Sequence, residues 1–158
     1  MELLLRPAAE DDYEGVNAVF ADELAHHVSL LPDRFQPADP VMPRDWFLEV
    51  LANPNKMLIV AEAGGRLVGQ ILIIDSVNMD DPIYRPRRYL DVDELAVLAE
   101  YRRQGIGRRL MQAAEQFAAE SGIPTVELNV WEANPQALSF YERLGYRTVR
   151  RRMARDLT

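Results

Sequence analysis

The chain has 158 residues, enough for one globular domain that spans residues 1–158, and it lacks cysteine, which excludes a disulfide scaffold, a thiolate metal site and an acyl-cysteine intermediate. Its 18 basic and 25 acidic residues give a net charge of −7, which disfavours general nucleic-acid binding and favours cationic ligands. No apolar run is long enough to cross a bilayer and the N-terminus shows no signal-peptide pattern, so we expect a cytoplasmic protein that binds neither membranes nor nucleic acid.

Hydrophobic periodicity predicts the elements of the first half of the chain. A first strand at Leu3–Leu5 precedes a helix whose apolar stripe starts at Tyr13 and fades near His26 and His27. Four prolines then break residues 31–43 into a loop. A second helix follows at Arg44–Leu51. The strands Met57–Ala63 and Leu67–Ser76 are predicted to pair as a hairpin through Gly64-Gly65, and residues 78–87 form a polar loop.

A tight turn between a strand and a helix is the most informative feature of the second half. Leu90–Leu98 is typical of a largely buried strand, and apolar residues recur at helical spacing from Ile106 to Ser121-Gly122. A helix start favours anions, because its first N–H groups lack partners and carry the positive end of the dipole. Gly105 and Gly107 let a phosphate approach the backbone, and flanking arginines add positive charge.

The spacing of this turn excludes two common nucleotide motifs. A Rossmann fingerprint needs a third glycine or alanine where this chain has Leu110, and the Gly-Lys-Ser/Thr of a Walker A loop is absent. The last elements are predicted as a strand at Thr125–Trp131, a helix at Pro135–Leu144 that stops at Gly145, and a strand at Tyr146–Ala154.

Three ordered motifs resemble the GNAT superfamily of acetyl-CoA-dependent N-acetyltransferases: the strand end Glu94–Val97, the Arg/Gln-x-x-Gly-x-Gly/Ala turn, and Asn134–Tyr146. The resemblance implies an α/β fold with a mixed α+β sheet in the order βααβββαβαβ, here with a shortened C-terminal strand region that leaves room for a homodimer partner. It implies acetyl-CoA as acetyl donor, with no metal. The cofactor-binding positions that it implies are Leu95, Ala96, Val97, Arg102, Arg103, Gln104, Gly105, Ile106, Gly107, Arg108, Asn134 and Tyr141.

Two residues near the C-terminus have both a structural and a catalytic interpretation. The resemblance implies that Tyr141 protonates the sulfur of departing CoA, whereas its helical spacing with Leu138 and Leu144 also suits a core residue. Asn134 before Pro135 predicts a helix cap, and its place two turns before Tyr141 lets it also contact CoA.

The general base stays open between two carboxylates and a water chain. Asp91 and Glu94 both precede the acetyl-binding residues, and a strict period of two places Asp91 and Asp93 on one face and Glu94 on the other. The resemblance implies a glutamate five residues before Asn134 in enzymes that act on protein N-termini, but Asn129 stands there. The adjacent histidines are typical of surface or capping residues and are too few for a metal site.

We therefore expect an N-acetyltransferase that moves acetyl from acetyl-CoA to a primary amine by direct attack in a ternary complex. The acceptor is a small-molecule amine, with a protein N-terminus or a lysine as the alternative. A noncatalytic acyl-CoA sensor and an assembly domain on the same fold are the alternatives from other classes.

Overall fold

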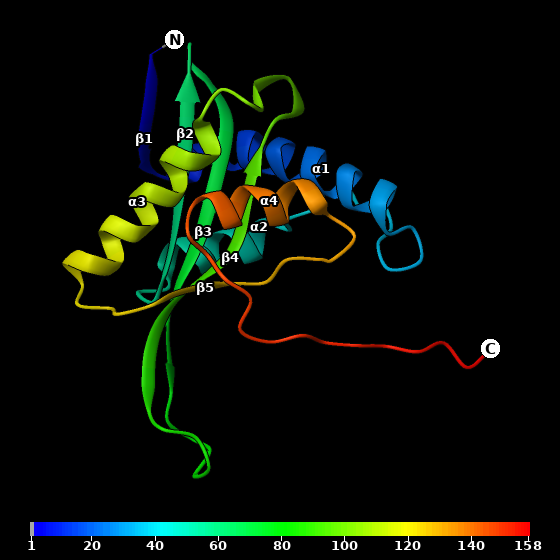
Figure 1. Ribbon diagram of the computed structural model, residues 1–158. Helices are drawn as coiled ribbons and strands as arrows, with labels where there is room; N and C mark the ends of the chain where they lie inside the picture. The colour runs from blue at the N-terminus through cyan, green and yellow to red at the C-terminus, as the bar shows by residue number, and fades with distance from the viewer. Residues whose placement is uncertain (1) are drawn as a thin grey trace.

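The computed structural model describes residues 2–158 and contains one five-stranded sheet in the order β1-β2-β3-β4-β5 (Figure 1). The first four strands pair antiparallel, and β5 pairs parallel to β4, so the sheet is mixed as predicted. The strands are β1 (Leu3–Pro7), β2 (Lys56–Ala63), β3 (Arg66–Asn78), β4 (Arg87–Val97) and β5 (Val126–Leu128).

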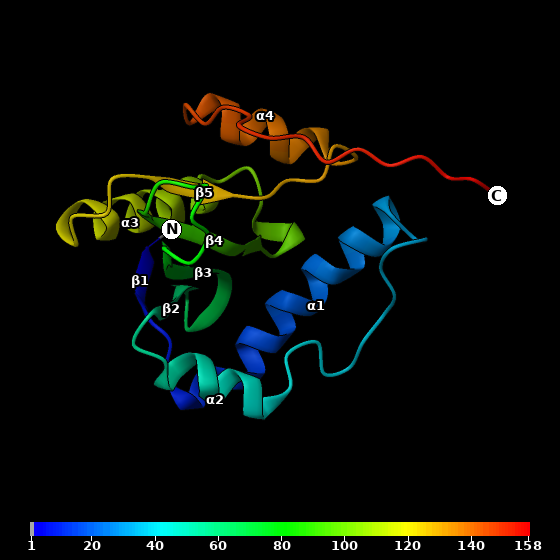
Figure 2. The same ribbon diagram turned by 90° about the horizontal axis from the view of Figure 1, so that it is seen from below.

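Four helices cover the two faces of this sheet. They are α1 (Tyr13–Leu30), α2 (Arg44–Ala52), α3 (Ile106–Glu120) and α4 (Pro135–Arg143), with short 3₁₀ turns at Glu10–Asp12 and Ala99–Tyr101. Figure 2 shows α1 and α2 on one face and α3 and α4 on the other. None of the helices within residues 2–158 is long and apolar enough to cross a membrane.

Two apolar clusters fix the helices on the sheet. On one face, Val16 of α1 and Phe47 of α2 pack with Leu72 and its neighbours on β2 and β3. On the other face, the buried stripe of α3, which includes Leu110, packs with Ile71 and its neighbours. Burial of these side chains is the main stabilising contribution, since each fully buried aliphatic residue contributes about 1.5–3 kcal/mol.

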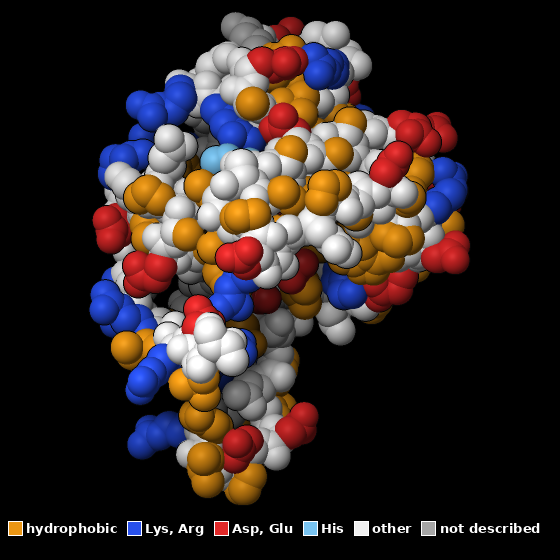
Figure 3. All heavy atoms as spheres, turned by 90° about the vertical axis from the view of Figure 1, so that its right-hand side faces the viewer, with side chains coloured by type: hydrophobic (Ala, Val, Ile, Leu, Met, Phe, Trp, Pro, Cys, Tyr) orange, Lys and Arg blue, Asp and Glu red, His pale blue; other side chains and the backbone are white. Residues whose placement is uncertain are grey.

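The β3–β4 hairpin extends beyond the rest of the sheet as an arm. Its register continues to Asn78 opposite Arg87, whereas β2 reaches only Ile74. The arm is the green hairpin at the bottom of Figure 1, and Figure 3 shows apolar side chains at its tip. The large exposed apolar residues there are Val77, Met79, Ile83 and Tyr84. The loop predicted at residues 78–87 is therefore shorter than expected, because Asn78 and Arg87 still pair with each other as strand residues.

The C-terminal prediction is wrong: Tyr146–Ala154 forms no strand, and residues 147–158 are exposed and irregular. A strand persists only where a neighbour supplies ladder hydrogen bonds, and no described strand lies beside this segment. The last strand of the sheet, β5, is also shorter than the predicted Thr125–Trp131, with three residues paired to β4. That a second copy of the chain completes this region in a homodimer stays a prediction. The α1 helix is longer than predicted and continues past His26 and His27 to Leu30.

The strict alternation expected along β4 is also wrong. Leu72 lies opposite Glu94 while Ile73 lies opposite Val92, so Asp93 is an extra residue in a β-bulge. The bulge reverses the alternation, because the strand takes two residues where its partner takes one. Asp91 and Glu94 therefore share the face covered by α1, opposite Ile74 and Leu72.

Candidate active site

The turn before α3 has the backbone shape of an anion-binding site. Arg103 and Gly105 have positive φ angles of 64° and 82°, and α3 begins at the next residue, Ile106. No side chain caps this helix start, so its first N–H groups stay free. Left-handed residues next to a helix N-terminus turn successive N–H groups toward one concave side. The sequence-predicted anion site thus has the required local geometry.

Gly107 allows α3 and α4 to approach one another. A Cβ built at this glycine would lie 3.4 Å from the ring of Phe140 and 3.9 Å from Val97. A methyl group there would fit, but a larger side chain would push the two helices apart. Ile106 is buried in the core below the turn, so it holds the helix start in place.

The arginines around the turn have different partners. Arg102 donates from Nε to the Val97 carbonyl at 2.9 Å and from Nη2 to Asp22 at 2.9 Å, which ties the turn to β4 and α1. Gln104 donates to the Glu100 carbonyl at 3.2 Å, and Arg109 donates to the Leu3 carbonyl at 3.2 Å. Arg108 is exposed on the first turn of α3.

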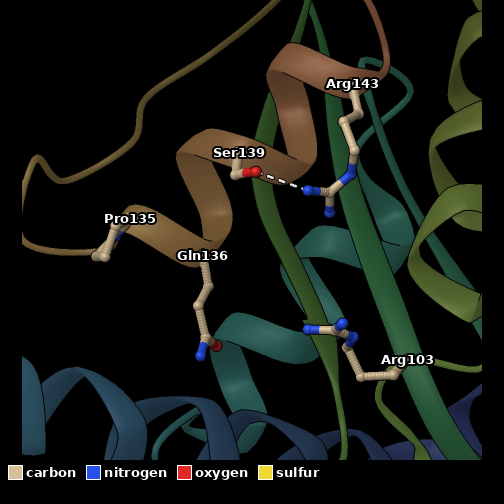
Figure 4. Close-up of a pocket in the computed structure, with 5 residues that line it drawn as sticks. All are labelled: Arg103, Pro135, Gln136, Ser139 and Arg143. Carbon is tan, nitrogen blue, oxygen red and sulfur yellow. Dashed lines mark hydrogen bonds between the residues drawn. The ribbon is translucent and has the colours of Figure 1, made fainter.

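Arg103 lies beside a surface cavity of about 240 Å³. The other lining residues come from α4 and are Pro135, Gln136, Ser139 and Arg143. Figure 4 shows the side chains of Arg103 and Arg143 approaching this hollow from opposite sides, with Arg143 donating to Ser139 Oγ at 2.6 Å. Two guanidinium groups at one hollow suit a phosphate, because arginine matches its geometry with paired N–H donors.

The strands β4 and β5 separate beside this turn. Their parallel pairing ends at Val92 and Leu128, so the edge of β4 that carries Leu95, Ala96 and Val97 has no β5 partner. On its other edge the same segment remains paired with β3. Backbone groups on the free edge can bind an extended ligand arm, apart from the Val97 carbonyl, which accepts from Arg102.

Asn134 caps α4 as predicted, since its Oδ1 accepts from the Ala137 N–H at 3.0 Å. The same helix carries Tyr141, whose ring packs against the core and edge-on to Phe140 and Tyr146 at 5.0 and 5.9 Å. Burial, and to a smaller degree the charge of Glu23, raises the pKa of Tyr141, so its hydroxyl stays protonated across the neutral range. Its core packing and a role as proton donor are compatible.

Glu94 lies among groups that oppose its ionisation. Burial raises its pKa well above the ordinary range, and the charges of Glu23 and Asp93 raise it further. One side-chain donor partly offsets this, because Gln70 Nε2 lies 3.2 and 3.4 Å from the two carboxylate oxygens. Asp91 precedes Glu94 on β4, and its pKa is raised by burial and by the charges of Asp93 and Glu127.

Two residues that act on Glu94, Glu23 and Gln70, were not predicted from the sequence. Glu23 follows Val16 and Val19 at helical spacing, so it continues the buried stripe of α1 with a carboxylate. Gln70 is fully buried in an otherwise apolar stretch of β3, and its Oε1 has no hydrogen-bond partner within the described residues. A polar residue inside an apolar stripe is the signal that could have identified both.

The histidines predicted as surface or capping residues lie beside Glu23. His27 Nδ1 is 3.3 Å from the Glu23 carboxylate and 3.2 Å from the Glu23 carbonyl oxygen. The His27 ring lies 5.0 Å from the ring of Phe35 at a tilt of 35°, and Phe35 meets Trp131 edge-on at 5.6 Å. These rings join the end of α1 to the segment between β5 and α4. Within residues 2–158, no group of three or more metal-ligating side chains is gathered as for a metal ion.

Comparisons with known proteins agree with this geometry. The profile of the Acetyltransferase (GNAT) family matches residues 21–146. Aminoalkylphosphonate N-acetyltransferase of Salmonella typhimurium is 29% identical over 153 residues, which cover 97% of this chain and 90% of that protein. Mycothiol acetyltransferase of Propionibacterium freudenreichii is 29% identical over 140 residues, which cover 89% of this chain but 41% of that protein. N-acetyltransferase family 8 member 3 of Rattus norvegicus is 36% identical over 87 residues, which cover 55% of this chain and 36% of that protein. The chain thus spans about two fifths of the length of these last two relatives.

Solved structures share the fold over nearly the whole chain. A mutant of the BH1408 protein from Bacillus halodurans superposes with a TM-score of 0.94 at 23% identity and covers 98% of this chain and 99% of that chain. An aminoglycoside N-acetyltransferase in complex with CoA superposes with a TM-score of 0.73 at 15% identity, covering 99% and 96%. The family profile matches well over half of the chain, on the same sheet, turn and helix that form the site, and the chain therefore belongs to the Acetyltransferase (GNAT) family.

Proposed function

We propose that this protein transfers the acetyl group of acetyl-CoA to a primary amine by direct attack in a ternary complex. The observation that carries this proposal is the position of the uncapped, left-handed turn at Gly105 beside the free edge of β4. Such a turn binds pyrophosphate, and such an edge binds the amide-containing arm of CoA. The free edge follows directly after Glu94, a candidate base, and α4 carries Tyr141, a candidate acid.

The donor fits the residues of this region. The pyrophosphate would bind the free N–H groups at the start of α3, and a further phosphate would bind at the hollow between Arg103 and Arg143. The thioester would lie along Leu95–Val97, where a backbone N–H stabilises the oxyanion of the tetrahedral intermediate. Asn134, which caps α4, precedes Tyr141 by about two helical turns, so it would contact the CoA arm from the same side of the helix.

The acceptor reacts in one balanced sequence. Its nitrogen must first be neutral, and Glu94, or a water held by it, accepts the proton of the ammonium. The lone pair then forms the new bond to the carbonyl carbon, and the carbon–sulfur bond breaks. The departing thiolate takes its proton from the Tyr141 hydroxyl, which burial keeps protonated. The nitrogen, which carries one surplus proton after attack, gives it through water to the Tyr141 phenolate, and the hydroxyl is restored. Asp91 shares the face of Glu94 and is the second candidate base.

A thiol-release assay with a panel of amines tests the proposed function. Purified protein and acetyl-CoA are mixed with alkylamines, amino acids, aminoglycosides or N-terminal peptides, and free CoA is measured with a thiol reagent. We expect release with at least one small-molecule amine, and a rise in melting temperature with acetyl-CoA alone. A melting shift without release under any acceptor supports a sensor. No melting shift at all supports an assembly domain and overturns the proposal.

A further inference from the structure

The α1 helix brings Glu23 to the same site as Glu94. Val19 packs on Ala96 of β4, and Glu23 follows it one helical turn later on the same face of the helix. Glu94 lies two residues before Ala96 and, after the bulge, on the same face of the strand. In Figure 2 the C-terminal half of α1 and helix α4 lie on opposite sides of the end of β4. The charge of Glu23 accordingly raises the pKa of both Glu94 and Tyr141.

The positive groups around Glu23 do not neutralise this pair of carboxylates. The Arg102 guanidinium is bound to Asp22 and to the Val97 carbonyl. His27 contacts Glu23 through one nitrogen that also lies near a backbone carbonyl, and it is positive only when protonated. His26, Asp22 and Arg102 are the other charged or titratable groups that act on Glu23, whose pKa is raised chiefly by burial. For Glu23, burial thus outweighs the attraction of His27 and Arg102, and none of these positive groups acts on Glu94.

A second observation is that a hydrogen-bond donor is missing beside Glu94. Gln70 is fully buried, its Nε2 is directed at Glu94, and its Oε1 has no donor within the described residues. A buried acceptor without a partner costs about 1–3 kcal/mol, so a donor that reaches it is favoured. A proton brought to Glu94 by an acceptor amine supplies that donor, because the amide can turn its oxygen toward the protonated carboxyl.

We propose that the acceptor is an alkyl diamine, with Glu23 holding the ammonium that does not react while Glu94 receives the proton of the nitrogen that does. This inference rests on the proposed function and names its substrate class. A monoamine would leave one of the two carboxylates without a counter-charge, whereas a diamine balances both. Phe35, whose ring lies 5.0 Å from the ring of His27, adds apolar surface against which the alkyl chain of a diamine can pack.

The test compares straight-chain diamines with monoamines of the same carbon number, from three to six carbons, in the thiol-release assay. We expect kcat/KM for the best diamine to exceed that of its matched monoamine by at least about tenfold, the size of one well-placed ion pair of about 1.4 kcal/mol. Glu23→Gln should bring this ratio down toward one, and Glu23→Asp should restore part of it. Glu14→Gln removes the same charge from an exposed position on the same helix and should keep the ratio.

Two further measurements separate the possible failures. The rise in melting temperature with acetyl-CoA shows that Glu23→Gln is folded and binds the donor. Calorimetric titration of the diamine into CoA-saturated protein should give weaker binding for Glu23→Gln than for Glu14→Gln. Equal rates for diamines and monoamines, or an unchanged ratio in Glu23→Gln, overturn the diamine inference and leave the acetyltransferase proposal standing. Absence of thiol release with every amine overturns both.

Discussion

Replacing Glu94 with glutamine should make the protein more stable while it removes activity. In the wild type, the Gln70 Oε1 is buried without a donor, and Glu94 can only accept hydrogen bonds when it is ionised. A glutamine at position 94 keeps the shape of the side chain, continues to accept from Gln70 Nε2, and adds an N–H₂ donor for Gln70 Oε1. It also removes the carboxylate that faces Glu23.

The magnitude follows from these two changes. Pairing a buried acceptor that had no partner is worth about 1–3 kcal/mol. In addition, each pKa unit by which folding raises the pKa of Glu94 costs about 1.4 kcal/mol at a pH above that raised value. For a domain of this size, each kcal/mol corresponds to about 2–4 °C in melting temperature. We therefore expect Glu94→Gln to melt about 3–10 °C higher than the wild type at pH 8.

The pH dependence gives this prediction its sign. Folding raises the pKa of Glu94, so the folded state binds more protons than the unfolded chain between the ordinary glutamate pKa and the raised one. Wild-type stability therefore falls as pH rises through that window. Glu94→Gln lacks this fall, and its advantage should be small in acid and grow with pH until it levels off above the raised pKa.

Thermal unfolding followed by circular dichroism from pH 4 to 9 measures this difference. Asp33→Asn, at an exposed loop position, serves as the charge-matched control and should change the melting temperature little. The reasoning would be refuted by a Glu94→Gln protein that melts at or below the wild-type temperature at pH 8, or by a difference that does not vary with pH. Activity should fall by about a hundredfold in the same variant.

Four further predictions concern catalysis and donor binding. Gly105→Val forces a β-branched residue to a φ of 82° and should weaken acetyl-CoA binding more than about tenfold by calorimetry; unchanged affinity would exclude the turn as the pyrophosphate site. Tyr141→Phe keeps the ring and should lower kcat about a hundredfold with acetyl-CoA affinity nearly intact; full turnover would leave Tyr141 as a core residue. Arg103→Ala should weaken acetyl-CoA binding, whereas Arg102→Ala should mainly lower the melting temperature, and the opposite result would exchange their roles. The value of kcat/KM should rise with pH as Glu94, whose pKa is raised, loses its proton; a flat profile from pH 5 to 9 would exclude it as base.

The amino-acid sequence by itself determined the features that depend on neighbours along the chain. The tight turn at Gly105, the start of α3 and the Asn134 cap depend on a few adjacent residues, and the sequence predicts each at its place; the left-handed φ of Gly105 is added by the structure. The order of elements through α4 followed from hydrophobic period. The faces of the helices followed too, since amphipathic stripes such as that of α3 must bury one side.

Tertiary structure decided what depends on contacts between distant segments. The bulge at Asp93 depends on how β3 pairs with β4, which local pattern does not reveal. It places Asp91 and Glu94 on one face of the sheet, whereas a regular alternation of side chains would separate them. The strand predicted at Tyr146–Ala154 is absent because a ladder needs a partner, which local pattern cannot supply. Glu23 and Glu94 are 71 positions apart in the sequence, and only the packing of Val19 on Ala96 brings their charges to one site.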